Sequence, residues 1–404
     1  MVYHRAMPII RVVLLCFSVL MLLACGSSES GESVADQEDA APIGQPVVLG
    51  SEQVSFEFAP DGRLFFNLRQ LGEIRWFDMN QWEPGQAVST ADLSRGELFA
   101  TEDVRARNEC GLLGITLDPD FATNHYVYVY LTQTTSNEEV ATLRVVRYTD
   151  VDGQGTDRTV IVELLDTVAG VCVHVGGGLH FGPDGYLYLS IGNNEQKERA
   201  GGLDNPLGKF LRFDKRDGSP APDNPFIDDP EADPRIFAHG IRNTFDFAFH
   251  EETGTIYAPD NGPGNCDELN VIESGKDYGI PGSLPRAETE TCLGLGGVDP
   301  IYLFSLPDTV PEEFTSNVAP AGMTFLPRGT YEGLGNALLI CEFLTGNMRY
   351  LEFGGPDNDE IVRDLVLIDD CRFNVALDSE GVIYYSGKDI IYRLPPELMP
   401  EPQS

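Results

Sequence analysis

The sequence repeats one short pattern six times: an apolar or aromatic residue, a turn of the Pro-Asp-Gly type, and then alternating aliphatic and aromatic residues. The clearest copy is Phe181-Gly-Pro-Asp-Gly-Tyr-Leu-Tyr-Leu. Asp and Gly accept the backbone angles of tight turns, and alternation with period two is typical of half-buried strands. Each copy therefore predicts two antiparallel strands joined by a tight turn. The copies begin at Phe58, Leu117, Phe181, Phe249, Phe325 and Leu377.

The spacing of these copies predicts an all-β protein, a six-bladed β-propeller of four-stranded antiparallel blades. Successive copies begin roughly 50 to 75 residues apart, which leaves room for four strands and long connections. No convincing helical period longer than about two turns interrupts them. A large β-sandwich is the alternative, but a sandwich does not need six equivalent turns.

The N-terminal segment has the layout of a secretory signal, with His4, Arg5 and Arg11 before an apolar run at 12–23 that is too short to span a bilayer. The run ends in Leu-Leu-Ala-Cys25-Gly, which resembles the lipobox of bacterial lipoproteins. We therefore expect Cys25 to be lipidated and the protein to be exported. The lipid would anchor it to the cell envelope, at the outer membrane or the periplasmic face. An ordinary cleaved signal with a chance cysteine is the alternative, and it too implies export.

These features predict three parts of the chain. Residues 1–24 are the signal peptide, 25–45 a flexible tether, and 46–397 the propeller. The tether is predicted because a segment rich in Ser, Glu, Asp, Ala and Gly cannot repay the entropy of ordering. The net charge of -37 argues against nucleic acid or an anionic membrane surface as a partner, so we expect membrane contact through the N-terminal lipid only.

Six cysteines remain once Cys16 leaves with the signal and Cys25 carries the lipid. An even number in an oxidising compartment predicts up to three disulfides. No CxxC pair occurs, so neither zinc binding nor c-type haem attachment is expected. The six are Cys110, Cys172, Cys266, Cys292, Cys341 and Cys371.

Three segments carry a family resemblance, and together they cover most of the predicted propeller. The first is Glu109-Cys-Gly-Leu-Leu-Gly-Ile-Thr-Leu-Asp-Pro-Asp-Phe. The second begins with His174 and Gly-Gly-Gly-Leu-His-Phe-Gly-Pro-Asp-Gly, and continues to Leu-Gly-Lys-Phe-Leu-Arg and Asp-Asn-Pro-Phe at 207–226. The third runs from His239-Gly-Ile-Arg-Asn through Asn-Gly-Pro and Asp-Glu-Leu-Asn to Asp-Tyr-Gly-Ile-Pro281. In order and spacing they resemble the soluble quinoprotein glucose/sorbosone dehydrogenases, which include the aldose sugar dehydrogenases that use pyrroloquinoline quinone (PQQ).

The resemblance implies oxidation of an aldose sugar at its anomeric carbon, dependent on PQQ and calcium, with hydride passing to the quinone and electrons to an external acceptor. It implies that His174 is the base, which suits an imidazole. It further implies that Arg242 stabilises the anionic reduced quinone, and that Arg242, Asn243 and Glu109 bind the cofactor. The metal residues that it implies are Gly262 and Pro263 for the catalytic calcium, and Glu268 and Tyr278 for a second, structural calcium.

The sequence also departs from the family pattern around the predicted site. The two residues expected as Asn and Arg after the base are Val175 and Gly178, and the acid expected after the Ser-Ile-Gly turn is Asn193. A lysine and two arginines that would hold the quinone carboxylates fall on Leu344, Cys371 and Phe373. Arg372 is offset by one residue, which in a strand would turn it to the other face. Possible substitutes on other strands are Arg349, Arg328 and Lys388.

These departures keep two alternatives open: a binding propeller that has lost the quinone, since buried carboxylates without cations are costly, and a calcium-dependent lactonase-like hydrolase. They also bear on the cysteines. By this alignment Cys341 and Cys371 lie in the two strands that would hold the carboxylates, so we expect them to pair. We expect Cys266 to pair with Cys292 near the Gly-Pro site, and Cys110 with Cys172 to join adjacent blades close to His174.

Overall fold

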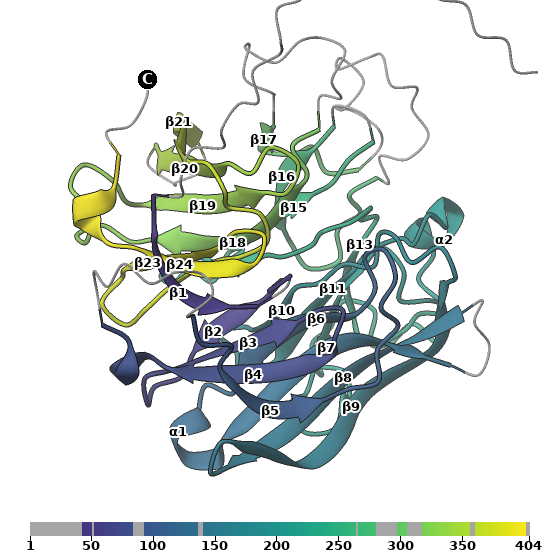
Figure 1. Ribbon diagram of the computed structural model, residues 1–404. Coiled ribbons are helices and arrows are strands. Elements are labelled where there is room, and N and C mark those ends of the chain that lie inside the picture. The colour runs from purple at the N-terminus through teal and green to yellow at the C-terminus, as the bar shows by residue number, and fades with distance from the viewer. Residues whose placement is uncertain are drawn as a thin grey trace, which may run out of the picture. The chain divides into compact units, whose positions relative to one another are not determined.

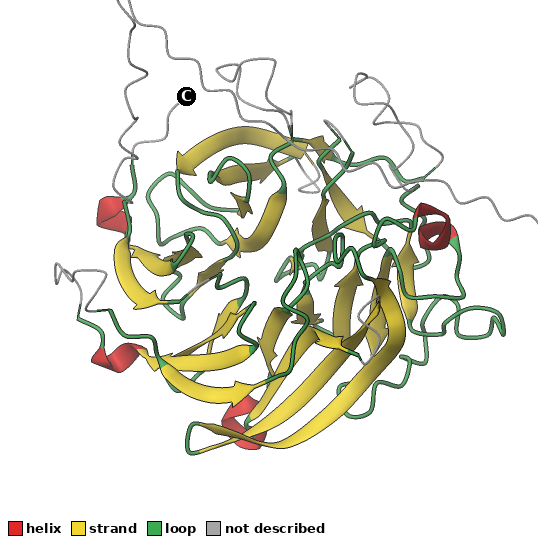
Figure 2. Ribbon diagram, turned by 45° about the vertical axis from the view of Figure 1, so that its right-hand side comes forward, coloured by secondary structure: helices red, strands yellow, loops and turns green. Residues whose placement is uncertain are grey.

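The structure is a computed structural model that describes residues 43–50, 52–83, 93–135, 140–263, 266–279, 297–304, 317–355 and 360–400. The predicted architecture is confirmed: the strands form six four-stranded sheets in which all pairs are antiparallel. Figure 2 shows these sheets as blades arranged round a common centre. We number the blades 1 to 6 along the chain.

Each of the first five blades is built from four consecutive strands (Figure 1). The first strand of each blade is the innermost, and the chain then runs outward. Blade 1 holds β2(Phe56–Phe58), β3(Arg63–Leu68), β4(Glu73–Asp78) and β5(Glu97–Thr101). Blade 2 holds β6(Leu112–Leu117), β7(Tyr126–Thr134), β8(Val140–Val151) and β9(Gln154–Ala169). Blade 3 holds β10(Leu179–Phe181), β11(Leu187–Ile191), β12(Lys209–Phe213) and β13(Ile236–His239). Blade 4 holds β14(Ala248–Phe249), β15(Ile256–Asp260), β16(Glu268–Ile272) and β17(Tyr302–Leu303). Blade 5 holds β18(Pro320–Leu326), β19(Ala337–Glu342), β20(Met348–Gly354) and β21(Glu360–Ile368).

Blade 6 closes the ring by combining the two ends of the described chain. Its inner strands are β22(Val375–Leu377), β23(Ile383–Ser386) and β24(Ile390–Leu394), and its outermost strand is β1(Gln45–Leu49). Strand β1 pairs antiparallel with β24, with Gln45 opposite Arg393. The innermost strands of blades 6 and 1, β22 and β2, are in contact. Pairing of an N-terminal strand with C-terminal strands therefore holds the first and last blades together.

The repeated turns lie where the pattern predicts them, between the first and second strand of a blade. In the turns of blades 1, 3 and 6 the aspartate side chain accepts a backbone N–H two residues later, as Asp61 does from Arg63 and Asp184 from Tyr186. Gly62 and Gly185 follow with positive φ angles of 89° and 80°. These side-chain and backbone preferences explain why the same residues recur in equivalent turns.

The core of the protein is divided among the gaps between blades. The described residues form six buried apolar clusters, and each cluster takes its members from two adjacent blades. Between blades 2 and 3, for example, Tyr128 and Tyr130 pack with Leu187 and Leu211. Because each blade face is covered by its neighbour, six small cores replace one large one.

Helix is scarce in the described chain, as predicted. The α-helices are α1(Phe121–Asn124) and α2(Lys197–Gly201), and the 3-10 turns include η1(Met79–Gln81) and η4(Pro396–Leu398). None of these described helices has the length and apolar character needed to cross a membrane. The predicted signal peptide, Cys25 and the tether up to residue 42 lie outside the described residues, and β1 begins beside the predicted start of the propeller.

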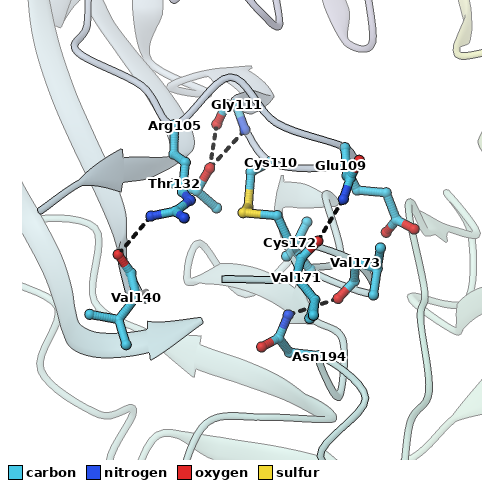
Figure 3. The surroundings of a disulfide bond; sticks show 12 residues. Arg105, Glu109, Cys110, Gly111, Thr132, Val140, Val171, Cys172, Val173 and Asn194 are labelled. Carbon is cyan, nitrogen blue, oxygen red and sulfur yellow. Dashed lines mark hydrogen bonds between the residues drawn. A yellow bond between two sulfur atoms is a disulfide. The ribbon is translucent and has the colours of Figure 1, made fainter. Parts of the chain in front are cut away.

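Two of the three expected disulfides are confirmed. Cys110 pairs with Cys172 across a Cα–Cα distance of 5.4 Å, and Cys341 pairs with Cys371 across 4.9 Å. The first joins the connection entering blade 2 to the connection entering blade 3 (Figure 3). The second runs from β19 to the connection between β21 and β22, whereas we expected both cysteines in strands. The pairing of Cys266 with Cys292 stays a prediction, since Cys292 lies outside the described residues.

Candidate active site

A cavity of about 300 Å³ lies on the propeller axis, at the end of the blades opposite the repeated turns. In each blade, a residue just before the innermost strand lines it: Val54, Glu109, His174, Asn243, Ala319 and Phe373. These six residues come from six connections that are far apart in the sequence. The remaining lining residues are Glu52, Arg69, Asn108, Arg242, Phe245, Asn261, Asn317, Pro320, Ala321 and Phe343.

The structure therefore brings together four residues that the sequence singled out: His174, Arg242, Asn243 and Glu109. His174 lies between β9 and β10, whereas Arg242 and Asn243 lie between β13 and β14 and Glu109 lies before β6. They belong to the connections that lead into three successive blades. This convergence is the geometry that a shared catalytic role would require.

His174 is mostly buried, and its Nδ1 has no hydrogen-bond partner among the described residues. Burial lowers the pKa of His174 to about 4, and the nearby charge of Arg242 adds to this effect. The Asn193 side chain acts in the opposite direction by favouring the protonated ring. The imidazole is consequently neutral around pH 7 and can accept a proton.

The buried carboxylate of Asp260 fixes the backbone of Arg242, the cationic residue on this side of the cavity. Asp260, at the end of β15, accepts hydrogen bonds from the backbone N–H of Arg242 at 2.8 Å and of Asn243 at 2.5 Å. Burial raises the pKa of Asp260, and these two N–H donors oppose the rise. The guanidinium of Arg242 donates to the carbonyl of Asn261. Among the described residues no carboxylate forms an ion pair with it, so its charge is available to a ligand.

The Asn261-Gly262-Pro263 turn follows β15 directly. Asn261 lines the cavity, whereas Gly262 and Pro263 lie beside it and are not among the lining residues. A side chain at Gly262 would collide with the carbonyl of Cys266, so the turn requires glycine. The oxygens Asn261 Oδ1 and Asp267 Oδ1 are buried and have no hydrogen-bond partner in the described structure. The N–H of Gly262 also points to the Asp267 carboxylate.

The two residues predicted for a structural calcium, Glu268 and Tyr278, have different hydrogen-bond partners in the structure. Glu268 lies in β16 opposite Asp260, and its side chain accepts a hydrogen bond from Asn270. The hydroxyl of Tyr278 instead donates to the carbonyl of Val271 and accepts from the N–H of Glu273. In the part of the chain that is described, no group of three His, Cys, Asp or Glu side chains is placed to hold a metal ion.

Acidic side chains around the Gly-Pro turn are nevertheless buried close together. Burial raises the pKa of Asp267 to about 7, although the N–H groups of Ala319 and Val318 donate to it. Burial, together with the charges of Asp260 and Asp267, raises the pKa of Glu268 to about 8. A cation at this place would stabilise the charged forms of these buried carboxylates, which burial disfavours.

The wall opposite His174 is apolar. The rings of Phe343 and Phe373 lie 5.4 Å apart there, next to Ala319 and Pro320. Leu344, where a lysine was expected, is exposed, and Cys371 is bonded to Cys341. None of the three positions at which cations were expected carries one, and of these three only Phe373 is among the described lining residues.

Arg372 does not lie in a strand, because residues 369–374 form the connection between β21 and β22. Our strand-face argument for this residue was wrong in that respect. Its guanidinium donates to the carbonyl of Phe343 on the outside of the wall. The possible substitutes Arg349, Arg328 and Lys388 do not line the cavity either, and Arg349 is bound to Glu342 and Asp364.

Sequence reasoning missed several lining residues, of which the charged pair Arg69 and Glu52 is the most informative. Arg69 follows β3, forms an ion pair with Glu52, and donates to the carbonyl of Cys110 at 2.9 Å. No repeat or motif marks these residues. Asn261 was part of a quoted motif, and its position next to the Gly-Pro pair was the signal that could have found it.

The comparison with known families shows to which of them the chain belongs. The glucose/sorbosone dehydrogenase family matches residues 51–389, which include every lining residue of the cavity. The chain belongs to the glucose/sorbosone dehydrogenase family. The resemblance stated from the motifs is thereby confirmed, and with it the expectation of an oxidoreductase family.

Individual members of the glucose/sorbosone dehydrogenase family are similar to this chain. Aldose sugar dehydrogenase YliI of Escherichia coli strain K12 is 31% identical over 226 residues, which are 55% of this chain and 57% of that protein. The match thus spans little more than half the length of that relative. An oxidoreductase (glucose dehydrogenase) structure from Thermus thermophilus has a TM-score of 0.67 at 27% identity and covers 86% of this chain and 98% of that one.

A third comparison concerns a structure with a bound cofactor. The PQQ-bound form of aldose sugar dehydrogenase from Streptomyces coelicolor has a TM-score of 0.66 at 24% identity, covering 87% of this chain and 96% of that one. At this identity the likeness shows a shared fold. What the cavity binds must be argued from its own residues.

Proposed function

We propose that the protein oxidises an aldose sugar at its anomeric carbon, with PQQ and calcium bound at the axial cavity and His174 as the base. The observation that carries the proposal is the convergence of His174, Arg242 and Asn243 on one cavity in a member of this family. When bound, the quinone would supply the hydride acceptor and calcium would polarise its carbonyl.

His174 would accept the proton of the anomeric hydroxyl. Since Nδ1 is buried, the other edge of the ring, with Nε2, is the one available to a substrate in the cavity. The pKa of about 4 keeps the ring unprotonated at pH 7, so that no proton must be lost before the reaction. Arg242 would stabilise negative charge that develops next to it, and its backbone is held for this purpose by Asp260.

The cavity residues fit a planar quinone, with fewer cations than a tricarboxylate would ideally meet. Phe245, Phe343 and Phe373 offer apolar surfaces to a fused ring, and Asn243 and Asn261 offer amide groups at its edge. Two arginines are among the described lining residues; Arg69 is paired with Glu52, so within this described lining Arg242 is the cation for an anionic group. The carboxylates of PQQ would therefore be held mainly at the Arg242 side.

Calcium fits the Gly-Pro turn because the available donors there are hard oxygens. Asn261 Oδ1 and Asp267 Oδ1 are buried without partners, and the backbone carbonyls of Gly262 and Pro263 belong to the same turn. Carbonyl and amide oxygens would thus supply most of the ligands, with Asp267 as a carboxylate. Glu268 would add negative charge close by rather than complete a site with Tyr278.

We further propose that the mature protein is exported and anchored to the cell envelope by lipid at Cys25, and that it passes electrons to an external acceptor. The N-terminal sequence motif supports the anchor. The family match and the solved structures give no support to the two alternatives, the non-catalytic binding propeller and the calcium-dependent hydrolase.

Reconstitution tests the proposal. The purified chain, incubated with PQQ and calcium chloride, should reduce an artificial dye when aldoses are added, and should not do so when calcium is removed by a chelator.

The variant His174→Ala should bind the quinone and lose turnover by about 10²-fold or more, since general base catalysis contributes about that much. His125→Ala is the matched control, because His125 lies at the C-terminal end of α1 and does not line the cavity. Turnover by His174→Ala at the wild-type rate would refute the assignment of the base.

A further inference from the structure

The backbone around His174 is held in an unfavourable conformation. His174 has a φ of 52° and Cys172 a φ of 51°, in the left-handed region that is unfavourable for non-glycine residues. Such residues keep this conformation only when the surrounding structure fixes it. The contacts that fix residues 172–174 therefore also determine where the His174 imidazole lies.

Those contacts come from two short segments. The carbonyl of Cys172 accepts the N–H of Glu109 at 2.9 Å (Figure 3). The N–H of His174 donates to Glu109 Oε2 at 2.7 Å. On the other side, Asn194 donates its side-chain amide to the carbonyl of Val173 at 2.8 Å and its backbone N–H to the carbonyl of His174 at 2.9 Å. Four of the six polar backbone groups of residues 172–174 are thus bonded, two of them to Glu109 and two to Asn194.

A covalent bond reinforces the first of these contacts. Cys110, the neighbour of Glu109, forms the disulfide with Cys172, and both cysteines are fully buried. Residues 109–110 and 172–174 are therefore joined by one disulfide and two hydrogen bonds within three residues. The Cys341–Cys371 disulfide in blades 5 and 6 has no such link to the base.

The same carboxylate oxygen also reaches the connection into blade 4. Glu109 Oε2 accepts the side-chain amide of Asn243 at 3.2 Å, and the amide oxygen of Asn243 accepts the N–H of Gly176 at 3.1 Å. One oxygen thereby contacts both His174 and Asn243, which come from different connections. Burial raises the pKa of Glu109, whereas these donors and the charge of Arg242 lower it.

We propose that Glu109, fixed by the Cys110–Cys172 disulfide, is a positioning residue that sets the place of the His174 imidazole relative to Asn243. This inference rests on the proposed function, which gives His174 and Asn243 their roles. The contacts among these residues do not depend on it. The inferred role differs from the role that the family resemblance implied for Glu109, which was direct contact with the cofactor. The Glu109 carboxylate accepts its hydrogen bonds from protein groups, the N–H of His174 and the side-chain amide of Asn243.

Substitution of Glu109 tests the proposal. Glu109→Ala removes the shared acceptor, and a base displaced by about 1 Å is expected to lower kcat by about 10²-fold. Glu109→Gln keeps an oxygen acceptor and should restore most of kcat. Glu57→Ala is the matched control, because Glu57 is half-buried like Glu109 and also accepts a backbone N–H of the next blade, from Leu117, but lies beside a different pocket at the end of the blades with the repeated turns. It should leave kcat unchanged even if it lowers the Tm.

The disulfide is tested in the same way. The Cys110→Ser, Cys172→Ser double variant should lower kcat in the direction of Glu109→Ala. The Cys341→Ser, Cys371→Ser double variant is the matched control, and it should lower the Tm without changing the behaviour of His174. Because the Cys341–Cys371 bond adjoins the wall with Phe343 and Phe373, the two double variants are compared by the NMR titration of His174 without quinone. Equal shifts of that titration in both would mean that the effect is general loosening of the propeller, which contradicts the proposal.

A readout that does not need turnover separates this inference from the proposed function. In the protein without quinone, the His174 imidazole is titrated by NMR in the wild type, in Glu109→Ala and in Glu57→Ala. If Glu109 holds the ring in its buried place, its loss should move the titration from about pH 4 toward 6.5, and Glu57→Ala should not. An unchanged titration in Glu109→Ala would overturn the inference. Absence of sugar oxidation by the wild type would refute the proposed function alone.

Discussion

The protonation of His174 gives the sharpest test of the site, through the substitution Asn193→Asp. Asn193 is fully buried after β11, and its side chain favours the protonated form of His174. A carboxylate in its place would add a full negative charge where the wild type has a neutral amide. The substitution is nearly isosteric, so it changes the charge and leaves the packing almost intact.

The expected magnitude follows from the electrostatics of the site. A pKa of about 4 in place of 6.5 means that burial and Arg242 disfavour the imidazolium by about 3 kcal/mol. A unit charge at about 4 Å contributes about 4 kcal/mol at an effective dielectric constant of about 20, which is reduced by the cost of burying the aspartate itself. We therefore expect the pKa of His174 in Asn193→Asp to rise to about 6 or above.

The assay is the pH dependence of kcat/KM for an aldose in the reconstituted enzyme. The folded pKa lies below the ordinary value, so the base stays competent until the pH falls through about 4, and the wild type should retain activity at pH 5. Asn193→Asp should lose activity already as the pH falls through about 6. The control is Asn80→Asp, which makes the same change of charge in the exposed η1 turn of blade 1.

Two results would refute the reasoning. One is a wild-type profile that already falls at the ordinary histidine pKa, because the imidazole would then not be buried beside a cation. The other is a profile that Asn193→Asp leaves unchanged. NMR titration of the same variants checks that any shift belongs to His174 and not to another step of turnover.

Three further predictions concern the surroundings of the site. Phe373→Arg adds a cation to the apolar wall and should lower the Kd for PQQ about 10- to 100-fold, because a charged hydrogen bond is worth about 1.5–3 kcal/mol. The decrease should be larger at low salt. An unchanged Kd would contradict the account of this wall. Burial raises the pKa of Glu268 to about 8, above its unfolded value, so the calcium-free protein should lose stability as the pH rises through 8. The Tm should fall from pH 6 to 9, and it should fall less in Glu268→Gln, where the raised pKa of Asp267 near 7 remains, and not with calcium present. A Tm independent of pH in the calcium-free wild type would count against the cluster. Lys209→Met leaves the carbonyls of Ala200 and Leu207 without their donor and should cost about 2–4 kcal/mol in urea unfolding, whereas a loss below about 0.5 kcal/mol would show that water replaces the lysine.

The fold could be predicted from the sequence because its signals are local. A turn such as Pro183-Asp184-Gly185 and the alternation after it depend on a few adjacent residues, and six copies then specify the number of blades. The closure of the ring was not predicted, because β1 and β24 are separated by nearly the whole chain. No local pattern records which strand completes the last blade.

The site was only partly predictable, because it lies at the end of the blades where the connections differ from one another. His174 and Arg242 were found through motifs, and their convergence is confirmed. Arg69 lines the same cavity but belongs to a turn without any motif, so only the three-dimensional arrangement reveals it. Arg372 was placed in a strand by alignment with the family pattern, whereas the chain forms a connection at that point.

The most direct test of a quinone site on the propeller axis is an equilibrium titration of the purified protein with PQQ in the presence of calcium, followed by fluorescence. We predict saturable binding of one quinone per chain, weakened strongly in Arg242→Met and unchanged in Arg328→Met, since Arg328 is exposed and does not line the cavity. Failure of the wild type to bind at millimolar PQQ, or equal binding by Arg242→Met, would contradict this account.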